Sequence, residues 1–149
     1  MTENHLCATV SVRGVLRGPH GQILAMKRSS DHQWELPGGR LEPDEPPVSG
    51  LERELAEETG LDVRVESILC ADSWVNDQTQ DRFAVYYDCQ TSTKAVTLSH
   101  EHVDFQWISP TEAETILSEK HMAAIRAAPT RPSDGEISSV TAQSSVSRE

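Results

Sequence analysis

The sequence predicts a single α+β domain in which helices pack on a mixed β-sheet. Three observations lead to this class. The chain has 149 residues, which is the size of one domain. Several segments alternate apolar and polar residues with the period of two that is typical of strands. Two other segments carry the proline and capping signals of helix starts. We expect the domain to cover residues 1–128.

The N-terminal segment is expected to form two strands of the main sheet. Residues 6–17 place their apolar side chains on every second position, as a half-buried strand does. The turn residues 18–21 follow, and the apolar pattern resumes at residues 22–28, so we predict a hairpin. Gly14 inside the first strand marks either a bulge or a close approach of another chain segment.

The next segment combines a short strand with a helix. Trp34-Glu35-Leu36 is stopped by Pro37-Gly38-Gly39, which excludes a helix interior. A helix of about three turns is predicted from Pro46-Pro47, which suit a first turn, to Gly60, a natural C-terminal cap. The helix therefore begins soon after a sharp turn of the chain.

A second antiparallel strand pair is expected beyond this helix. Residues 63–70 and 82–88 are rich in strand-forming side chains, and the polar residues 76–81 form the loop between them. Aromatic residues in these and earlier strands could stack on a nucleobase, but strand aromatics are more often core residues. These residues are Trp34, Trp74, Phe83, Tyr86 and Tyr87.

The C-terminal region predicts one more strand, a helical segment and a tail. Residues 105–108 form the strand. Ser109-Pro110-Thr111-Glu112 is a capping box with proline at the first helical position, and it starts a helix that continues, unbroken or with one break, to Ala128. Residues 129–149 are rich in Ser, Thr, Gly, Pro and charges, which predicts a flexible tail.

Composition excludes several classes of function. Thirteen basic against 24 acidic residues give a net charge of −11, which disfavours binding to nucleic acid or to an anionic membrane surface. No apolar run is long enough to cross a membrane, and the first residues do not resemble a secretory signal, so we expect a cytoplasmic protein.

Cys7, Cys70 and Cys89 lack the number and spacing of disulfides or zinc ligands and are expected in the core.

The acidic residues gather around the predicted helix. Eight of them lie between residues 42 and 62, accompanied by a single basic residue, Arg53. At 3.6 residues per turn, Glu54, Glu57 and Glu58 fall within an arc of about 100° and share one helix face. The apolar face of the same helix is adjacent, which brings Glu58 close to the buried side.

Carboxylates at such spacing repel one another unless cations neutralise them. The ligands are hard oxygens without Cys or His, which favours Mg²⁺ or Mn²⁺ over zinc. Because Mg²⁺ combines a few carboxylates with waters and substrate phosphates, the cluster predicts both a metal and a phosphorylated ligand. The alternative is an ordinary solvated helix face.

The spacing around this helix resembles the box that defines the Nudix hydrolase family. Trp34 to Gly39 is also similar to the usual lead-in of that box. Every fixed position of the box is matched, by Gly39, Glu45, Arg53, Glu54, Leu55, Glu57, Glu58, Gly60 and Leu61. A match at this many positions is far more specific than a short glycine motif.

The resemblance implies a fold, a reaction and a ligand set. The fold would be an α/β/α sandwich with a mixed sheet and a loop-helix-loop, and the enzyme would hydrolyse a nucleoside diphosphate linked to another moiety with Mg²⁺ or Mn²⁺. Glu54, Glu57, Glu58 and the main-chain carbonyl of Gly39 would bind the metal. Arg53 and Glu45 would pair and fix the helix against its loop. Gly50 stands where the family commonly has alanine, at a cost of about 1 kcal/mol in helix propensity.

The general base is less well defined by the sequence. Either Glu54 or Glu57 is a candidate, and the resemblance adds Glu101, which precedes a predicted strand and could reach the metal. His100 and His102 are interpreted as exposed loop residues rather than a metal pair, because no third soft ligand is nearby. Arg28 is the basic residue that we expect to contact a substrate phosphate.

The substrate expected from the resemblance is a small nucleotide, with a nucleoside triphosphate as the default. Two alternatives are a noncatalytic Nudix domain that senses nucleotides, although all box glutamates are present, and an RNA 5′-pyrophosphohydrolase, which would need a more basic surface. The sequence is compatible with a monomer or a homodimer.

Overall fold

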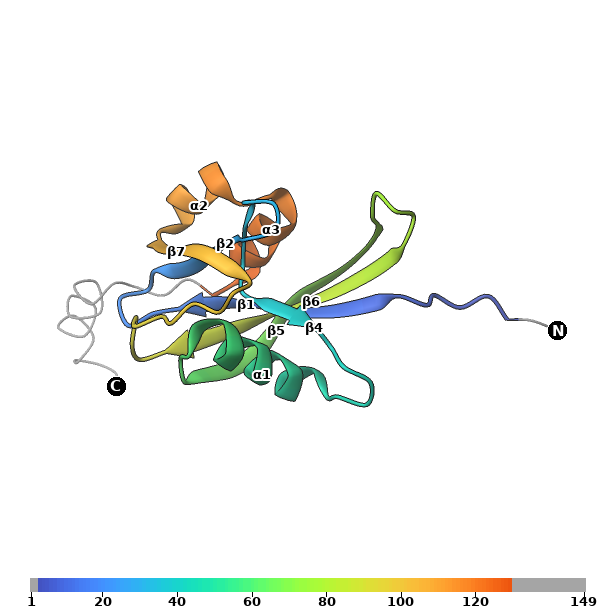
Figure 1. Cartoon of the computed structure of the whole chain (residues 1–149), viewed down its shortest axis with the longest axis horizontal. Coiled ribbons are helices and arrows are strands. Elements are labelled where there is room, and N and C mark those ends of the chain that lie inside the picture. Colours follow the sequence, from blue (N-terminus) through green and yellow to red (C-terminus); the bar gives the residue numbers. More distant parts are fainter. Residues whose placement is uncertain (1–2, 130–149) are drawn as a thin grey trace, which may run out of the picture.

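The structure, a computed structural model, describes residues 3–129 (Figure 1). Within that range the strands are β1 (Thr9–Arg17), β2 (Ile23–Arg28), β3 (Trp34–Glu35), β4 (Gly38–Arg40), β5 (Val63–Val75), β6 (Asp81–Thr91) and β7 (His102–Ile108). The helices are α1 (Pro47–Thr59), α2 (Pro110–Ile116) and α3 (Glu119–Ala127). The α+β class is therefore confirmed. The tail expected at residues 129–149 lies, apart from its first residue, outside the described residues.

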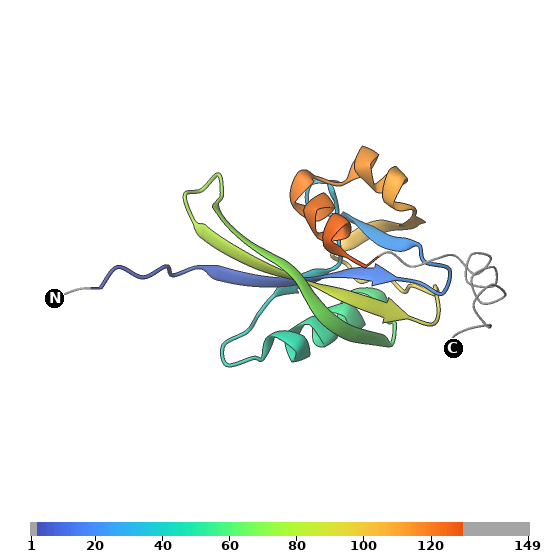
Figure 2. The same ribbon diagram turned by 180° about the vertical axis from the view of Figure 1, so that it is seen from behind.

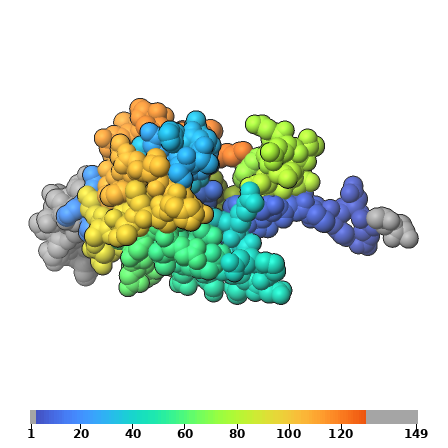
Figure 3. All heavy atoms as spheres, in the orientation of Figure 1, coloured from blue at the N-terminus to red at the C-terminus, as the bar shows by residue number. Residues whose placement is uncertain are grey.

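The strands form one mixed sheet in the order β3-β2-β1-β6-β5, with β4 pairing on β1 and β7 on β2. β1 and β6 run parallel, whereas the other pairs are antiparallel. The predicted hairpin of the first two strands and the later antiparallel pair are both present. The tip that joins β5 to β6 extends beyond the rest of the sheet, on the side of the sheet that carries α2 and α3 (Figures 1 and 3).

Helices cover both faces of the sheet (Figures 1 and 2). On one face, Leu51 and Leu55 of α1 are fully buried in a core with Val12 and Leu16 of β1. On the other face, α2 and α3 contribute a second core, to which the sheet adds residues such as Val15. The sandwich that the family resemblance implies is therefore the observed architecture. Because β1 is buried on both faces, it forms the centre of the molecule.

The helix boundaries follow the local signals. Pro47 is at the first helical position of α1, and Gly60 ends it in the left-handed region with φ of 69°, its N–H donating to Ala56. The capping box between Ser109 and Glu112 is formed in both directions. The predicted C-terminal helix is broken once, into α2 and α3.

Several predictions from the sequence could be tested only with the tertiary structure. Gly14 is a site of close approach, because a Cβ atom there would lie 3.0 Å from the Sγ atom of Cys89. Cys89 is buried as predicted, but Cys7 is exposed and Cys70 is half-buried, so the prediction of three core cysteines was wrong for Cys7. Val48, near the start of the helix that carries the buried Leu51 and Leu55, is 40% exposed. Within residues 3–129, no helix is both long and apolar enough to cross a lipid bilayer.

Candidate active site

Helix α1 presents two of its glutamates to the sheet. Glu58 is only 3% exposed, and its Oε1 accepts a hydrogen bond from the N–H of Gly38 at 3.1 Å. Burial raises the pKa of Glu58 to about 8, and burial also raises the pKa of Glu54 one turn earlier. Two carboxyl groups whose ionised forms are disfavoured by burial form a site that gains from a bound cation.

A third carboxylate comes from a distant part of the chain. Glu101 lies in the turn before β7, and one carboxylate oxygen of each of Glu54, Glu58 and Glu101 lies within 4.8 Å of the others. The turn is fixed to the end of β2, because Ser29 donates its N–H to the carbonyl of Glu101 and its Oγ–H to the carbonyl of His100, both at 2.9 Å. The fold thus brings together two of the three box glutamates that were expected to bind the metal and the candidate base outside the box.

Glycines allow the backbone to lie against these carboxylates. A Cβ atom at Gly39, on β4, would collide with the carboxyl group of Glu54. Gly38 has φ of 148°, and a Cβ atom there would collide with the carbonyl of Val12. Pro37-Gly38-Gly39, the segment that ends the preceding strand, is therefore the place where the chain of β4 passes close to the carboxylate cluster.

Arg53 holds the helix against the loop that precedes it. Its Nε and one terminal nitrogen donate to the two oxygens of Glu45 at 2.7 and 3.0 Å. Its other terminal nitrogen donates to Glu54 at 3.1 Å and to Glu57 at 3.3 Å. The Arg53 guanidinium, together with the N–H of Glu42, lowers the pKa of Glu45 to about 2. The geometry agrees with the fixing role expected for this pair.

Glu57 lies apart from the three clustered carboxylates. Its side chain is 59% exposed and contacts Arg53. Its role as a metal ligand stays a prediction.

A cavity of about 570 Å³ opens beside the carboxylates. Its walls carry the three clustered glutamates, Gly39, and four arginines, which are Arg13, Arg28, Arg40 and Arg82. The cavity therefore places carboxylates, which hold cations, opposite guanidinium groups, which bind phosphate. Arg28 was singled out from the sequence. Arg13, Arg40 and Arg82 come from different strands, and nothing in their local patterns predicts that they would meet there.

A second cavity of about 830 Å³ adjoins the first, because Arg13 and Arg28 line both. Trp34 and Trp74 are half-buried in its wall, and the tip between β5 and β6 contributes polar residues such as Asn76. Tyr86 is buried and also lines this cavity, whereas Tyr87 is a core residue outside it. Indole faces beside amide and carboxylate groups offer stacking and hydrogen bonding to a flat polar ring.

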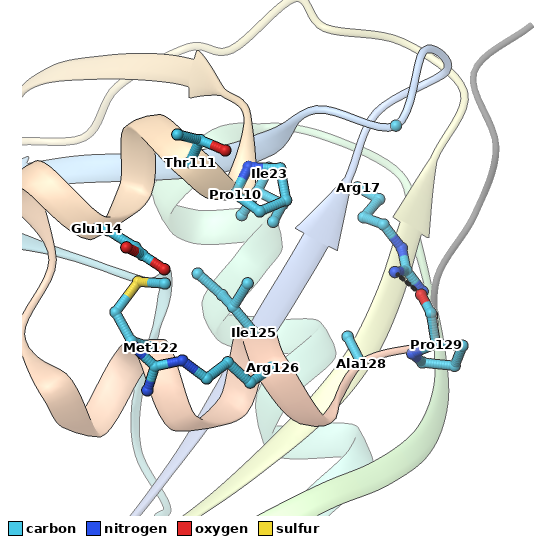
Figure 4. A pocket seen from close by; sticks show the side chains of 11 residues that line it. Arg17, Ile23, Pro110, Thr111, Glu114, Met122, Ile125, Arg126, Ala128 and Pro129 are labelled. Atoms are coloured by element: carbon cyan, nitrogen blue, oxygen red, sulfur yellow. Dashed lines mark hydrogen bonds between the residues drawn. The ribbon is translucent and has the colours of Figure 1, made fainter.

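A further cavity of about 350 Å³ lies between the β1–β2 turn and the helices α2 and α3 (Figure 4). Glu114 is the single carboxylate among its lining residues, and Met122 and Ile125 contribute apolar surface. Among the described residues, this cavity does not have the paired carboxylates that a metal-dependent reaction on phosphates requires.

The interpretation of His102 as an exposed loop residue was wrong. His102 is the first residue of β7, its side chain is 2% exposed, and its Nε2 lies 2.8 Å from Oε2 of Glu35. Burial alone would raise the pKa of Glu35, but the hydrogen bond from His102 and the charges of Arg13 and Arg28 outweigh it, so the pKa is below its ordinary value. His100 is exposed, as expected.

The fold and the site define a class of proteins, the hydrolases that act on phosphoric anhydride bonds, and the comparisons identify the family. The NUDIX domain matches residues 8–131, and the chain therefore belongs to the Nudix hydrolase family. A MutT-like protein of Streptomyces ambofaciens is 35% identical over 111 residues, which cover 74% of this chain and 70% of that protein.

A second relative in sequence and a solved structure are also similar to this chain. A putative 8-oxo-dGTP diphosphatase of Bacillus subtilis is 30% identical over 89 residues, covering 60% of this chain and 58% of that protein. The crystal structure of a MutT protein from Methanosarcina mazei superposes with a TM-score of 0.72 at 27% identity, covering 80% of this chain and 92% of the other.

Proposed function

We propose that this protein is a Mg²⁺-dependent pyrophosphohydrolase of small nucleotides, with a nucleoside triphosphate as the substrate class. The observation that carries this proposal is the carboxylate cluster of Glu54, Glu58 and Glu101 facing an arginine-lined cavity. The names of the relatives, which include a putative 8-oxo-dGTP diphosphatase, support a nucleotide substrate.

The residues present fit a hard divalent cation. Glu54, Glu58 and Glu101 supply oxygens close together, and the Gly39 carbonyl and Glu57 complete the proposed ligand set. When bound, Mg²⁺ would neutralise phosphate charge and lower the pKa of the attacking water, and Mn²⁺ could replace it. The high pKa of the Glu58 carboxyl, caused by its burial, implies that the cation displaces a proton when it binds near neutral pH.

The other residues of the site bind and orient the substrate in this proposal. Arg28 and Arg13 hold phosphate oxygens, and Arg53 fixes the orientation of Glu54 through their hydrogen bond. Glu101 is exposed, so a proton that it accepts from the attacking water can pass to the solvent. We therefore assign Glu101 as the general base, with Glu54 as the alternative within the box.

The cavity of Trp34 and Trp74 is the proposed place for the nucleoside. It adjoins the arginines, so a triphosphate chain can extend from the carboxylates to a base stacked on an indole ring. The net charge of −11 supports a small nucleotide over an RNA chain, which would need a cationic track beyond the site.

The test is a panel of nucleoside di- and triphosphates, nucleoside diphosphate sugars and a 5′-triphosphorylated RNA, incubated with Mg²⁺ while released phosphate and pyrophosphate are measured. We expect turnover of nucleoside triphosphates. Glu58→Gln and Glu54→Gln should lower kcat by about 100-fold or more, because each removes a charged ligand. Glu57→Gln should do the same if Glu57 binds the metal as proposed.

The matched control is Glu52→Gln, which removes a charge from an exposed position of the same helix outside the cluster. It should keep kcat within about twofold. Binding of a nucleotide without turnover of any panel member would contradict the proposal in favour of a sensor, and turnover of the RNA alone would favour the RNA 5′-pyrophosphohydrolase.

A further inference from the structure

A buried ion-pair network lies in the wall of the carboxylate cavity, and its two arginines also line the tryptophan cavity. Glu35 on β3 and His102 on β7 have side chains that are 5% and 2% exposed. Their strands both pair with β2, and the Nε2 of His102 donates to Oε2 of Glu35 at 2.8 Å. A carboxylate can only accept, so the bond fixes the proton on Nε2 when the ring is neutral.

The other oxygen of Glu35 meets two guanidinium groups. Oε1 accepts a hydrogen bond from Arg28 at 3.0 Å and lies 3.3 Å from a terminal nitrogen of Arg13. Arg13 also donates to the carbonyl of Leu36 at 2.7 Å, and Arg28 donates to both oxygens of Asp31 at 2.9 and 2.8 Å. Both guanidinium groups are thus held in place before any substrate binds.

The network bears on substrate binding because of where its two arginines lie. Arg13 and Arg28 are the charged side chains that line both the carboxylate cavity and the tryptophan cavity. A phosphate chain that extends from one cavity to the other passes them. His102 follows Glu101 directly, so the same hydrogen bond anchors the turn that carries the third carboxylate.

The burial of His102 costs free energy, and the need to fill space in the interior does not account for this cost. Its Nδ1 is buried and has no hydrogen-bond partner among the described residues. An apolar side chain of similar size would fill the same space without an unpaired nitrogen. A polar residue at this position is therefore more easily explained by what it holds than by the stability that it adds.

We propose that the Glu35–His102 pair is a positioning device, which holds Arg13 and Arg28 as a phosphate clamp and ties this clamp to the turn of Glu101. Both residues of the pair also line the carboxylate cavity, and in this proposal they act through the arginines. The inference rests on the proposed function in so far as the clamped phosphate belongs to a nucleotide.

The test measures the binding of inorganic tripolyphosphate with Mg²⁺ by calorimetry, and the KM and kcat for the nucleoside triphosphate that the panel identifies. Tripolyphosphate has no base, so it reports on the phosphate clamp alone. His102→Leu should raise both the dissociation constant and KM about tenfold, the effect of one lost charge-assisted hydrogen bond, with a smaller change in kcat. His102→Gln, whose amide can still donate to Glu35, should restore most of the affinity.

A double-variant comparison tests whether Glu35 acts through Arg28. Arg28→Gln and Glu35→Gln should each weaken tripolyphosphate binding, and the double variant should lose less than the product of the two effects. Thermal unfolding shows whether each variant is folded. We expect His102→Leu to lower the melting temperature, because Oε2 of the buried Glu35 loses its hydrogen-bond partner, and to remain folded at the assay temperature.

The outcomes separate the two proposals. If the wild type hydrolyses nucleotides while His102→Leu binds tripolyphosphate and substrate as tightly as the wild type, the positioning role is overturned and the proposed function stands. If His102→Leu loses affinity only in proportion to a loss of folded protein, the residue is structural and the positioning role is also overturned. If the wild type neither binds tripolyphosphate nor hydrolyses any nucleotide, both proposals fail.

Discussion

Histidine 121 shows how burial changes the chemistry of one residue. It lies on α3 in the wall of the tryptophan cavity, and its Nδ1 is 3.3 Å from the hydroxyl oxygen of Tyr86. Burial lowers the pKa of His121 to about 3 and raises that of Tyr86 to about 12. Both side chains are therefore neutral at physiological pH, and the cavity wall that they form carries no charge.

This shift makes the free energy of unfolding depend on pH. The unfolded chain protonates His121 near its ordinary pKa of 6.5, whereas the folded protein does so only near 3. The stabilisation is thus fully present above pH 6.5 and is lost as the pH falls toward 3, by up to about 1.4 kcal/mol per pH unit. Urea unfolding of the wild type and of His121→Gln between pH 7.5 and 4.5 measures it.

We expect the wild type to lose more free energy of unfolding than His121→Gln over this range. The control is His5→Gln, because His5 is exposed. Parallel curves for the wild type and His121→Gln would contradict the role of burial. At the same scale, Glu58 shows the opposite direction of shift, an acid whose pKa is raised by burial, and it is a ligand of the proposed cation.

At the scale of the elements, α1 and its preceding loop act as one unit. The Arg53–Glu45 pair crosses from the helix to the loop, and Gly50 lets the loop lie directly against the helix. A Cβ atom at Gly50 would collide with the side chain of Leu41 and lie 2.9 Å from Oε1 of Glu45. The helix-propensity cost expected for this glycine is thus offset by packing that alanine would prevent.

Gly50→Ala should therefore destabilise the protein, although alanine is the better helix former. We expect a net loss of about 1 kcal/mol in the free energy of unfolding, because an overpacking cost of about 1–3 kcal/mol is reduced by a gain of about 1 kcal/mol in helix propensity, and a lower kcat because Glu45 must move. Chemical denaturation and the panel assay measure the two effects. Ser49→Ala, at the adjacent exposed position of the helix, is the matched control and should leave stability unchanged or higher. Equal stability of Gly50→Ala and wild type would refute the packing argument.

At the scale of the whole molecule, the net charge of −11 and the carboxylate cluster have the same consequence, which is repulsion between acidic residues in the folded state. Acidic residues that repel one another destabilise the folded state, and a cation that binds only the folded site relieves this repulsion. In the proposed function the acids recruit the cation, and the four arginines that line the same cavity bind the phosphates in spite of the net charge.

Mg²⁺ should accordingly raise the melting temperature. At a concentration of about 100 times the dissociation constant, binding adds about 2.7 kcal/mol to the free energy of unfolding. Differential scanning calorimetry with Mg²⁺, with NaCl at equal ionic strength, and with EDTA separates binding from screening. The shift should vanish in Glu58→Gln and persist in Glu52→Gln. A melting curve that is the same with Mg²⁺ and with NaCl would contradict a metal site.

Much of the fold and half of the site were predictable because their signals are local. Helix α1, its glycine cap, the Ser109–Glu112 capping box and the strand pairs follow from periodicity and turn residues within a few positions of each other. Sharing of one face by Glu54 and Glu58 is likewise a property of a single helix. Burial of His102 could not be predicted, because its partner Glu35 is on another strand.

The sequence by itself determined the family, the helix that carries the glutamates and the acidic chemistry of this protein. All three depend on residues that are close together in the chain. Only the tertiary structure decided which groups meet. It brought Glu101 to Glu54 and Glu58, gathered arginines from several strands into one cavity, and buried Glu35 and His102 in the wall of that cavity. The reason is that these contacts depend on how strands distant in sequence pair in the sheet, which no local pattern specifies.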